Sequence, residues 1–231
     1  MVWLNSNLTK GNKLNAQNYH VFLSVTNAGL FIEDADIQSD CLWTMASIVD
    51  TPDDEVIDKA ATPEVIIKLI EFMGSSDVSI FIPALRAMGN ILSTSFSEIV
   101  ERCLWGGVLS KLTDLLYQSS SNVIKECLWC FSNIVAGPGT HIIQFVNSEA
   151  FDRVLFLSES KNLDVRKESV HVISHSITGA DVNLRGQIYN QSDCKVLKVM
   201  TDALNILDEK VILNSLEALE CLFNLDDWLG Y

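Results

Sequence analysis

Residues 128–135 read LWCFSNIV, and the same pattern occurs in LWTMASIV (42–49), LRAMGNIL (85–92) and VHVISHSI (170–177). The four stretches superpose without gaps and carry apolar residues at helical spacing. We call the second residue of each stretch its anchor position; the anchors are Trp43, Arg86, Trp129 and His171, so the pattern recurs after 43, 43 and 42 residues. The opening VWLNSNLT adds Trp3, 40 residues before Trp43. A period of this length indicates an array of helical repeats.

We call the helix that carries the anchor position of each repeat the last helix of that repeat. Four of these last helices are preceded by a second helical segment, and a short polar stretch joins the two helices of each pair. These segments are EVIIKLIEFM (64–73), GVLSKLTDLLY (107–117), AFDRVLFLSE (150–159) and CKVLKVMTDAL (194–204). The linking stretches GSSDVS, QSSSNV, SKNLDV and NILDEK have the composition of loops and helix N-caps. Residues 10–39 fit the repeat least well, with one helix predicted within NYHVFLSVTNAGLF. We therefore predict an all-α chain with two or three helices per repeat.

The period suits a two- or three-helix solenoid repeat of the armadillo or HEAT type. We expect a single armadillo-repeat array over residues 1–231, a right-handed superhelical solenoid of about five repeats. The last helix of each repeat is predicted near residues 1–8, 41–49, 83–93, 124–136, 166–178 and 210–225. Such an array buries the apolar face of each repeat against its neighbours and leaves a long concave surface. Because Met1 lies two residues before Trp3, we expect a fragment of a longer solenoid or an array with exposed apolar ends.

The amino-acid composition restricts which kinds of molecule the protein can bind. With 48% hydrophobic and 20% charged residues among 231, the chain is expected to fold. Its 30 acidic and 16 basic residues give a net charge of −14, which argues against nucleic acids and anionic membranes and favours a basic partner. No apolar run is long enough for a spanning helix, and the first residues do not form a signal peptide. We expect a soluble intracellular protein.

Each anchor residue has a partner four residues later, which we call the ladder position. The pairs are Trp3/Asn7, Trp43/Ser47, Arg86/Asn90, Trp129/Asn133 and His171/His175. At this spacing both side chains lie on one face of a helix, so stacked repeats would place flat rings beside a row of amides. An Asn amide can donate to and accept from a peptide backbone, and gaps between Trp rings can hold Lys or Arg stems. The pattern predicts a surface for an extended peptide.

Two alternatives remain open at this stage. A Trp at helical spacing is often a core residue, because buried aromatic side chains dominate core packing. The recurring Asn residues, Asn7, Asn90 and Asn133, could also form a structural ladder between repeats, since an Asn inside an apolar helix needs a hydrogen-bond partner. The chain would then be a degenerate armadillo interaction scaffold without basic-peptide binding.

The stretches LWTMASIV, PALRAMGNIL, IKECLWCFSNIVAG and VRKESVHVISHSITG resemble the successive third helices of the importin-alpha family, the armadillo-repeat nuclear import adaptors. The resemblance covers nearly the whole chain and is strongest over residues 83–137, where Arg86 replaces Trp and Trp129 restores it. The segment KVLKVMTDALNILDEKVILNSLEALECLF resembles a late repeat of that family. In register, the chain would begin inside the fourth repeat and run into the ninth.

This resemblance implies a receptor for Lys/Arg-rich nuclear localisation peptides of cargo proteins, present in cytoplasm and nucleus. Trp3 and Asn7 match the last repeat of the family's major site, and Trp43 matches the next platform, with Ser47 where the family usually has Tyr. Trp129 and Asn133 match the first half of the minor site, where His171 and His175 replace Trp and Asn in the second half. The remaining candidates for peptide contact are Asp40, Arg86, Asn90, Glu126 and Glu168.

Two further expectations concern the second half of the minor site and the transport carrier. An imidazole is a smaller platform than an indole and repels a basic peptide when it is protonated. The N-terminal basic segment by which the family binds importin-beta has no counterpart here, so coupling to importin-beta or an export carrier is not assumed.

No motif indicates an enzyme, a metal or a cofactor. His171 and His175 have a spacing that zinc can use, but Val172 stands where zinc peptidases carry a catalytic Glu. Cys127 and Cys130 have the spacing of half a zinc knuckle, yet no second pair completes it, so we expect thiols of the core. The sequence predicts a binding protein.

Overall fold

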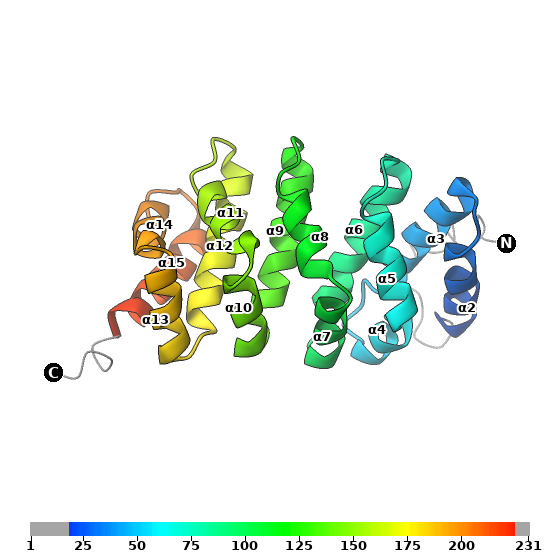
Figure 1. Cartoon of the computed structure of the whole chain (residues 1–231), viewed down its shortest axis with the longest axis horizontal. Coiled ribbons are helices and arrows are strands. Elements are labelled where there is room, and N and C mark those ends of the chain that lie inside the picture. Colours follow the sequence, from blue (N-terminus) through cyan, green and yellow to red (C-terminus); the bar gives the residue numbers. More distant parts are fainter. Residues whose placement is uncertain (1–18, 225–231) are drawn as a thin grey trace. The chain divides into compact units, whose positions relative to one another are not determined.

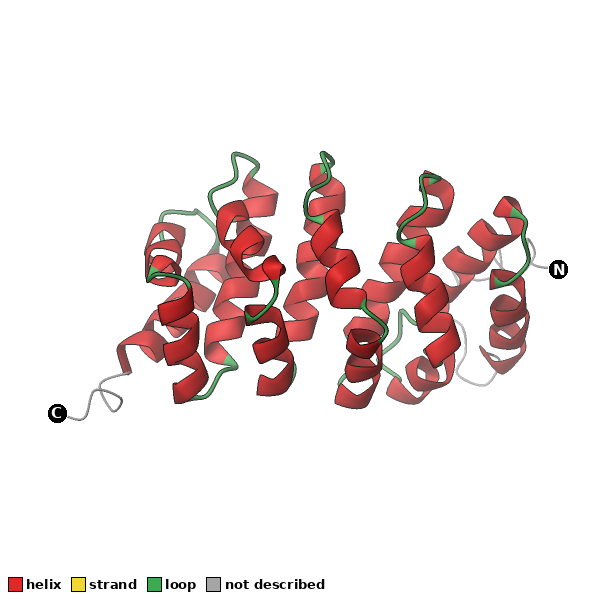
Figure 2. Ribbon diagram, viewed as in Figure 1, coloured by secondary structure: helices red, strands yellow, loops and turns green. Residues whose placement is uncertain are grey.

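A computed structural model describes residues 19–224, and these form helices joined by short connections (Figures 1 and 2). No strand occurs in this range, in agreement with the predicted all-α class. Trp3, Asn7 and the predicted last helix at 1–8 lie outside the described residues. By its internal contacts the chain divides into two compact units, residues 1–111 and 112–231, and each is described by itself.

The first unit is built around two long helices. Its elements are α2 (Tyr19–Leu30), α3 (Ala35–Ile48), α4 (Asp54–Ala60), α5 (Pro63–Phe72), α6 (Val78–Leu92) and α7 (Ser97–Trp105), and α8 (Val108–Leu115) crosses its boundary. Helix α3 packs against α2 on one side and α6 on the other, while α5 and α7 contact α6 and each other. The predicted helix within NYHVFLSVTNAGLF is confirmed as α2.

The second unit repeats the arrangement around three long helices. Its elements are α9 (Ser121–Val135), α10 (Gly139–Val146), α11 (Glu149–Leu157), α12 (Leu163–Thr178), α13 (Val182–Gln191), α14 (Lys195–Ala203) and α15 (Glu209–Phe223). Helix α12 packs between α9 and α15, and α11 and α14 lie in front of α12 and α15 in Figure 1. None of the described helices is sufficiently long and apolar to cross a membrane.

The last helices α3, α6, α9, α12 and α15 begin earlier than their apolar patterns indicated. Each starts at a residue whose side chain accepts a hydrogen bond from a backbone N–H of the first turn: Asp34, Asp77, Ser120, Asn162 and Asp208. Four of these caps lie in the polar stretches to which we assigned N-cap chemistry, and that prediction is confirmed. The first turns mix polar and apolar residues, so the hydrophobic pattern alone does not fix where each helix begins.

Between successive last helices the chain forms two further helices, so the repeat has three. The second is the predicted apolar segment, seen as α5, α8, α11 and α14. The first, seen as α4, α7, α10 and α13, was not predicted. These helices have seven to ten residues, a length similar to that of the second helices.

Aromatic and aliphatic side chains fill the interior of the second unit. Phe131 of α9, Phe145 of α10 and Phe151 of α11 form a chain of rings with centroids 5.5 and 5.7 Å apart, and each side chain is at most 1% exposed. Cys127 and Cys130 are buried in the same region as free thiols, which confirms their prediction as core residues. Burial raises the pKa of the Cys127 thiol, because the thiolate is poorly solvated there.

Truncating Phe131, the ring that α9 contributes to this chain, should destabilise the protein strongly. We expect Phe131→Ala to lower the free energy of unfolding by about 3–5 kcal/mol, since it removes apolar contacts and leaves a cavity. The control is Phe156→Ala, which truncates a ring that is 66% exposed and should cost less than about 1 kcal/mol. Urea unfolding measures both, and equal losses would contradict this packing.

Candidate functional site

The anchor residues of the first unit lie on the surface. Trp43 of α3 is 38% exposed and Arg86 of α6 is exposed, whereas the preceding residues, Leu42 and Leu85, are buried. Asp40 lies on α3 one turn before Trp43 and is half-buried. The interpretation of Trp43 as a core residue is therefore wrong, and a carboxylate lies at helical spacing from its exposed indole.

The ladder residues of the first unit are engaged within the fold. Ser47 Oγ donates to the Trp43 carbonyl at 2.9 Å, within its own helix. Asn90 Nδ2 donates to the Ala46 carbonyl at 3.0 Å and so joins α6 to α3. For Asn90 the alternative of a structural ladder between repeats is supported, because the amide bridges two successive last helices.

In the second unit, α9 and α12 bring two acidic side chains, Glu126 and Glu168, close enough to interact. Glu126, Trp129 and Asn133 of α9 are half-buried, as is Glu168 of α12. Burial raises the pKa of the Glu168 carboxyl above its ordinary value; Lys210 and Lys125 oppose the shift, and Asp164 and Glu126 reinforce it. Glu126 and Glu168 thus act on one another as like charges, and a cation placed between them would relieve their repulsion.

The two histidines of α12 belong to a hydrogen-bonded network with α15 and α9. Asn214 Nδ2 lies 3.0 Å from His171 Nδ1 and 3.3 Å from His175 Nε2. His175 Nδ1 lies 3.0 Å from Ser132 Oγ. An amide nitrogen can only donate, so both ring nitrogens that it meets accept, and His175 Nδ1 carries the ring proton and donates to Ser132. Protonating His171 Nδ1 or His175 Nε2 would therefore place a donor against a donor.

Both imidazoles are consequently neutral at pH 7. Burial lowers the pKa of His171 to about 4, with Lys210 and His175 acting in the same direction and Asp208 opposing them. The pKa of His175 also lies below its ordinary value, again chiefly through burial. The repulsion expected from protonated histidines is absent near neutrality. His171 is only 9% exposed, however, so little of its ring is available as a platform.

Asn214 is a residue of this region that the sequence analysis missed. It lies 43 residues after His171, in the anchor position of the following repeat, so extending the register by one repeat would have found it. The two units share one kind of contact between successive last helices. Asn90 bonds to Ala46 and His175 bonds to Ser132, and in each case the partner lies one residue before the ladder position of the preceding last helix.

The described residues, 19–224, contain no assembled metal site. No group of three or more His, Cys, Asp or Glu side chains that could hold a metal ion occurs there. Three of the four imidazole nitrogens of His171 and His175 are within hydrogen-bond distance of Asn214 or Ser132, which leaves the pair poorly arranged for zinc.

Comparison with solved structures identifies the fold. A designed armadillo repeat protein in complex with the peptide (KR)4 superposes with a TM-score of 0.82 at 21% identity, over 96% of this chain and 91% of that one. Another designed armadillo repeat protein gives 0.84 at 20%, with the same two coverages. A computationally designed armadillo repeat protein for modular peptide recognition gives 0.81 at 20%, over 95% and 91%. No protein-family model and no curated protein matches the sequence. The predicted armadillo-repeat fold is confirmed.

The histidine network predicts a stability that depends on pH. The folded pKa of His171 is depressed below its unfolded value of about 6.5, so its contribution is fully present above that pH and is lost as the pH falls through about 4. Between pH 7 and 4 we expect the wild type to lose about 3 kcal/mol more than His171→Gln, which keeps an acceptor without titrating. Urea unfolding at several pH values measures this, and parallel curves for both proteins would refute the network.

The Asn90 bond predicts a loss of stability that does not depend on any peptide. Asn90→Ala should lower the free energy of unfolding by about 1 kcal/mol, because it leaves the Ala46 carbonyl without this donor. Asn183→Ala, at an exposed position of α13, should change it by less than about 0.5 kcal/mol. Thermal unfolding compares the two variants. An unchanged Asn90→Ala protein would show that the bond contributes nothing.

Proposed function

We propose that this protein binds extended Lys/Arg-rich peptides along the last helices of its armadillo repeats. The observation that carries the proposal is the exposed indole of Trp43, one helical turn from Asp40, on a face where the neighbouring apolar residues are buried. An exposed Trp attracts a cation to its ring face, and a nearby carboxylate adds a charge-assisted contact.

The first unit also restricts where a basic side chain can bind. Arg86 occupies the anchor position of α6, so it repels a peptide cation placed directly over that helix. The favourable position is therefore over Trp43 and Asp40. Because Asn90 uses its amide hydrogen toward Ala46, the peptide backbone gains less from this ladder residue than the sequence alone predicted.

The second unit offers a more acidic counterpart. Glu126 lies one turn before Trp129 on α9, and Glu168 lies on the next last helix, α12. Burial and the like charge of Glu126 raise the pKa of Glu168 while Lys210 and Lys125 lower it, so a peptide Lys or Arg would act on Glu168 in the same direction as these two lysines. The net charge of −14 raises the encounter rate with basic peptides and makes it sensitive to salt. One armadillo repeat neighbour of the same fold is a complex with (KR)4, a peptide of this composition.

For the cellular role we propose a nuclear import adaptor acting in cytoplasm and nucleus. This rests on the resemblance of the last helices to those of the importin-alpha family, with cargo localisation signals as the basic peptides. Neither importin-beta nor an export carrier is included in the proposal, because no described surface of the chain has been assigned to a carrier.

A second candidate function is an armadillo interaction scaffold that does not bind basic peptides. Two observations favour it: the Asn90 amide is used between repeats, and His171 is buried beneath its contact with Asn214. Both features remove groups that a peptide-binding face would present. The two candidates differ in what Trp43 does, so a variant of that residue separates them.

Titration of the purified protein with fluorescent (KR)4 tests the proposal. We expect Trp43→Ala to raise the dissociation constant about tenfold, since the ring contributes about 1–2 kcal/mol to a bound cation. The matched control is Trp105→Ala on α7, which removes an indole that is 84% exposed but lies outside the last helices. That variant should bind (KR)4 as the wild type does.

Salt and composition provide the remaining controls. Binding of (KR)4 should weaken as salt rises, and an all-Ala peptide should not bind measurably. If the folded wild type does not prefer (KR)4 over the all-Ala peptide, or if both Trp variants bind equally well, the scaffold without basic-peptide binding becomes the better description.

A further inference from the structure

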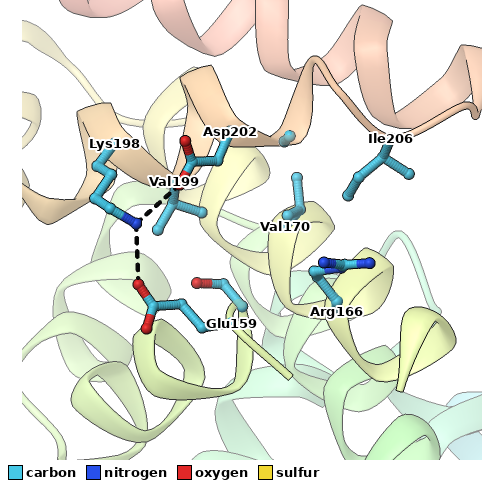
Figure 3. A pocket seen from close by; sticks show the side chains of 9 residues that line it. Glu159, Arg166, Val170, Lys198, Val199, Asp202 and Ile206 are labelled. Atoms are coloured by element: carbon cyan, nitrogen blue, oxygen red, sulfur yellow. Dashed lines mark hydrogen bonds and ion pairs between the residues drawn. The ribbon is translucent and has the colours of Figure 1, made fainter. Parts of the chain in front are cut away.

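A pocket of about 220 Å³ opens between α11, α12 and α14 of the second unit (Figure 3). Its apolar part consists of four side chains that are at most 9% exposed: Val170, Val199, Ala203 and Ile206. Its polar part consists of Ser158, Glu159, Arg166, Lys198 and Asp202. Polar side chains outnumber apolar ones in this lining, so a ligand would have to pair with the charged groups as well as contact the apolar side chains.

The charged side chains of the pocket differ in how many hydrogen-bond partners they have. Lys198 Nζ bonds to Glu159 Oε1 at 3.1 Å and to Asp202 Oδ2 at 2.8 Å. Arg166 Nε, by contrast, is buried and has no hydrogen-bond partner among the described residues. A buried N–H of a charged group without an acceptor is costly, so the position favours an anionic acceptor supplied from outside the chain.

Figure 3 shows that these groups lie at different ends of the pocket. Lys198, Glu159 and Asp202 lie together on one side, while Arg166 lies on the other, near Val170 and Ile206. The two carboxylates are neutralised in part by Lys198, so they oppose an anion at Arg166 only weakly. The side chains of Val170, Val199 and Ile206 line the same pocket, and each is at most 9% exposed.

We infer that this pocket binds a branched aliphatic carboxylate, with the carboxylate on the Arg166 guanidinium and the aliphatic group against Val170, Val199 and Ile206. A guanidinium matches a carboxylate with two parallel hydrogen bonds, which a neutral amide cannot reproduce. The volume equals that of about seven water molecules in the liquid, so it suits a ligand or chain end of similar size. A free short-chain acid and the C-terminal residue of a peptide share this chemistry.

The site has no lining residue in common with the proposed peptide site, so the two proposals can fail separately. The probes are 4-methylpentanoate for a free acid, N-acetyl-leucine for a chain end, and N-acetyl-leucinamide as the uncharged control. Binding to the purified full chain is followed by isothermal titration calorimetry. We expect at least one of the acids to bind at least tenfold more tightly than the amide, as a charge-assisted contact predicts.

Variants test the assignment of the carboxylate to Arg166. Arg166→Gln should weaken binding of the acid about tenfold or more, and Arg166→Lys should weaken it less, since it keeps the charge and loses the paired donors. Lys195→Gln removes a positive charge from α14 outside the pocket and should leave binding within about twofold of the wild type. Thermal unfolding of each variant establishes that it is folded.

The outcomes are distinct. Tighter binding of N-acetyl-leucine than of 4-methylpentanoate supports a peptide C-terminus as the ligand, and the reverse order supports a free acid. Equal binding of acids and amide, undiminished binding by folded Arg166→Gln, or no binding of either acid at 10 mM, roughly the weakest affinity worth assigning to so small a ligand, would overturn the inference.

Discussion

The contact between one last helix and the next is the interaction on which the rest of the structure depends. Helix α3 packs against α6 in the first unit, and α12 packs between α9 and α15 in the second. Buried apolar residues supply most of the free energy, as they do in any repeat protein whose units contact only their neighbours. Hydrogen bonds from the ladder position, Asn90 to Ala46 and His175 to Ser132, fix how successive helices meet.

The need for hydrogen bonds between successive last helices explains why polar residues occur at the ladder positions of apolar helices. Such a residue need not contact a peptide. A ladder residue has two possible partners, the preceding repeat or a bound chain, and each N–H donated to one is not offered to the other. In α6 an N–H of the Asn90 amide is donated to the Ala46 carbonyl of the preceding last helix. In α12 the two imidazoles share the amide of Asn214. Burial is the main cause of their lowered pKa values, and both rings are neutral at pH 7.

Much of the fold could be predicted from the sequence because the repeat is visible in the apolar positions. The pattern around Trp129 located α9, and the polar stretch before it supplied the cap Ser120. The first helix of each repeat, such as α7, escaped prediction, although the shorter helix α8 was found from its recurring apolar pattern. The candidate site was harder to predict from the sequence, because packing decides whether a ring is exposed or buried. Trp43 and His171 occupy equivalent positions, yet Trp43 is 38% exposed and His171 is 9% exposed.

The most direct test of the account asks which indoles a basic peptide contacts. Each Trp side chain gives one indole N–H resonance in a ¹H–¹⁵N correlation spectrum, and Trp→Ala variants assign the resonances. On titration with (KR)4 we predict that the resonances of Trp43 and Trp129 shift saturably while that of Trp105 stays in place. If Trp43 and Trp129 do not respond, or if Trp105 shifts with them, the last helices do not form a specific surface for basic peptides.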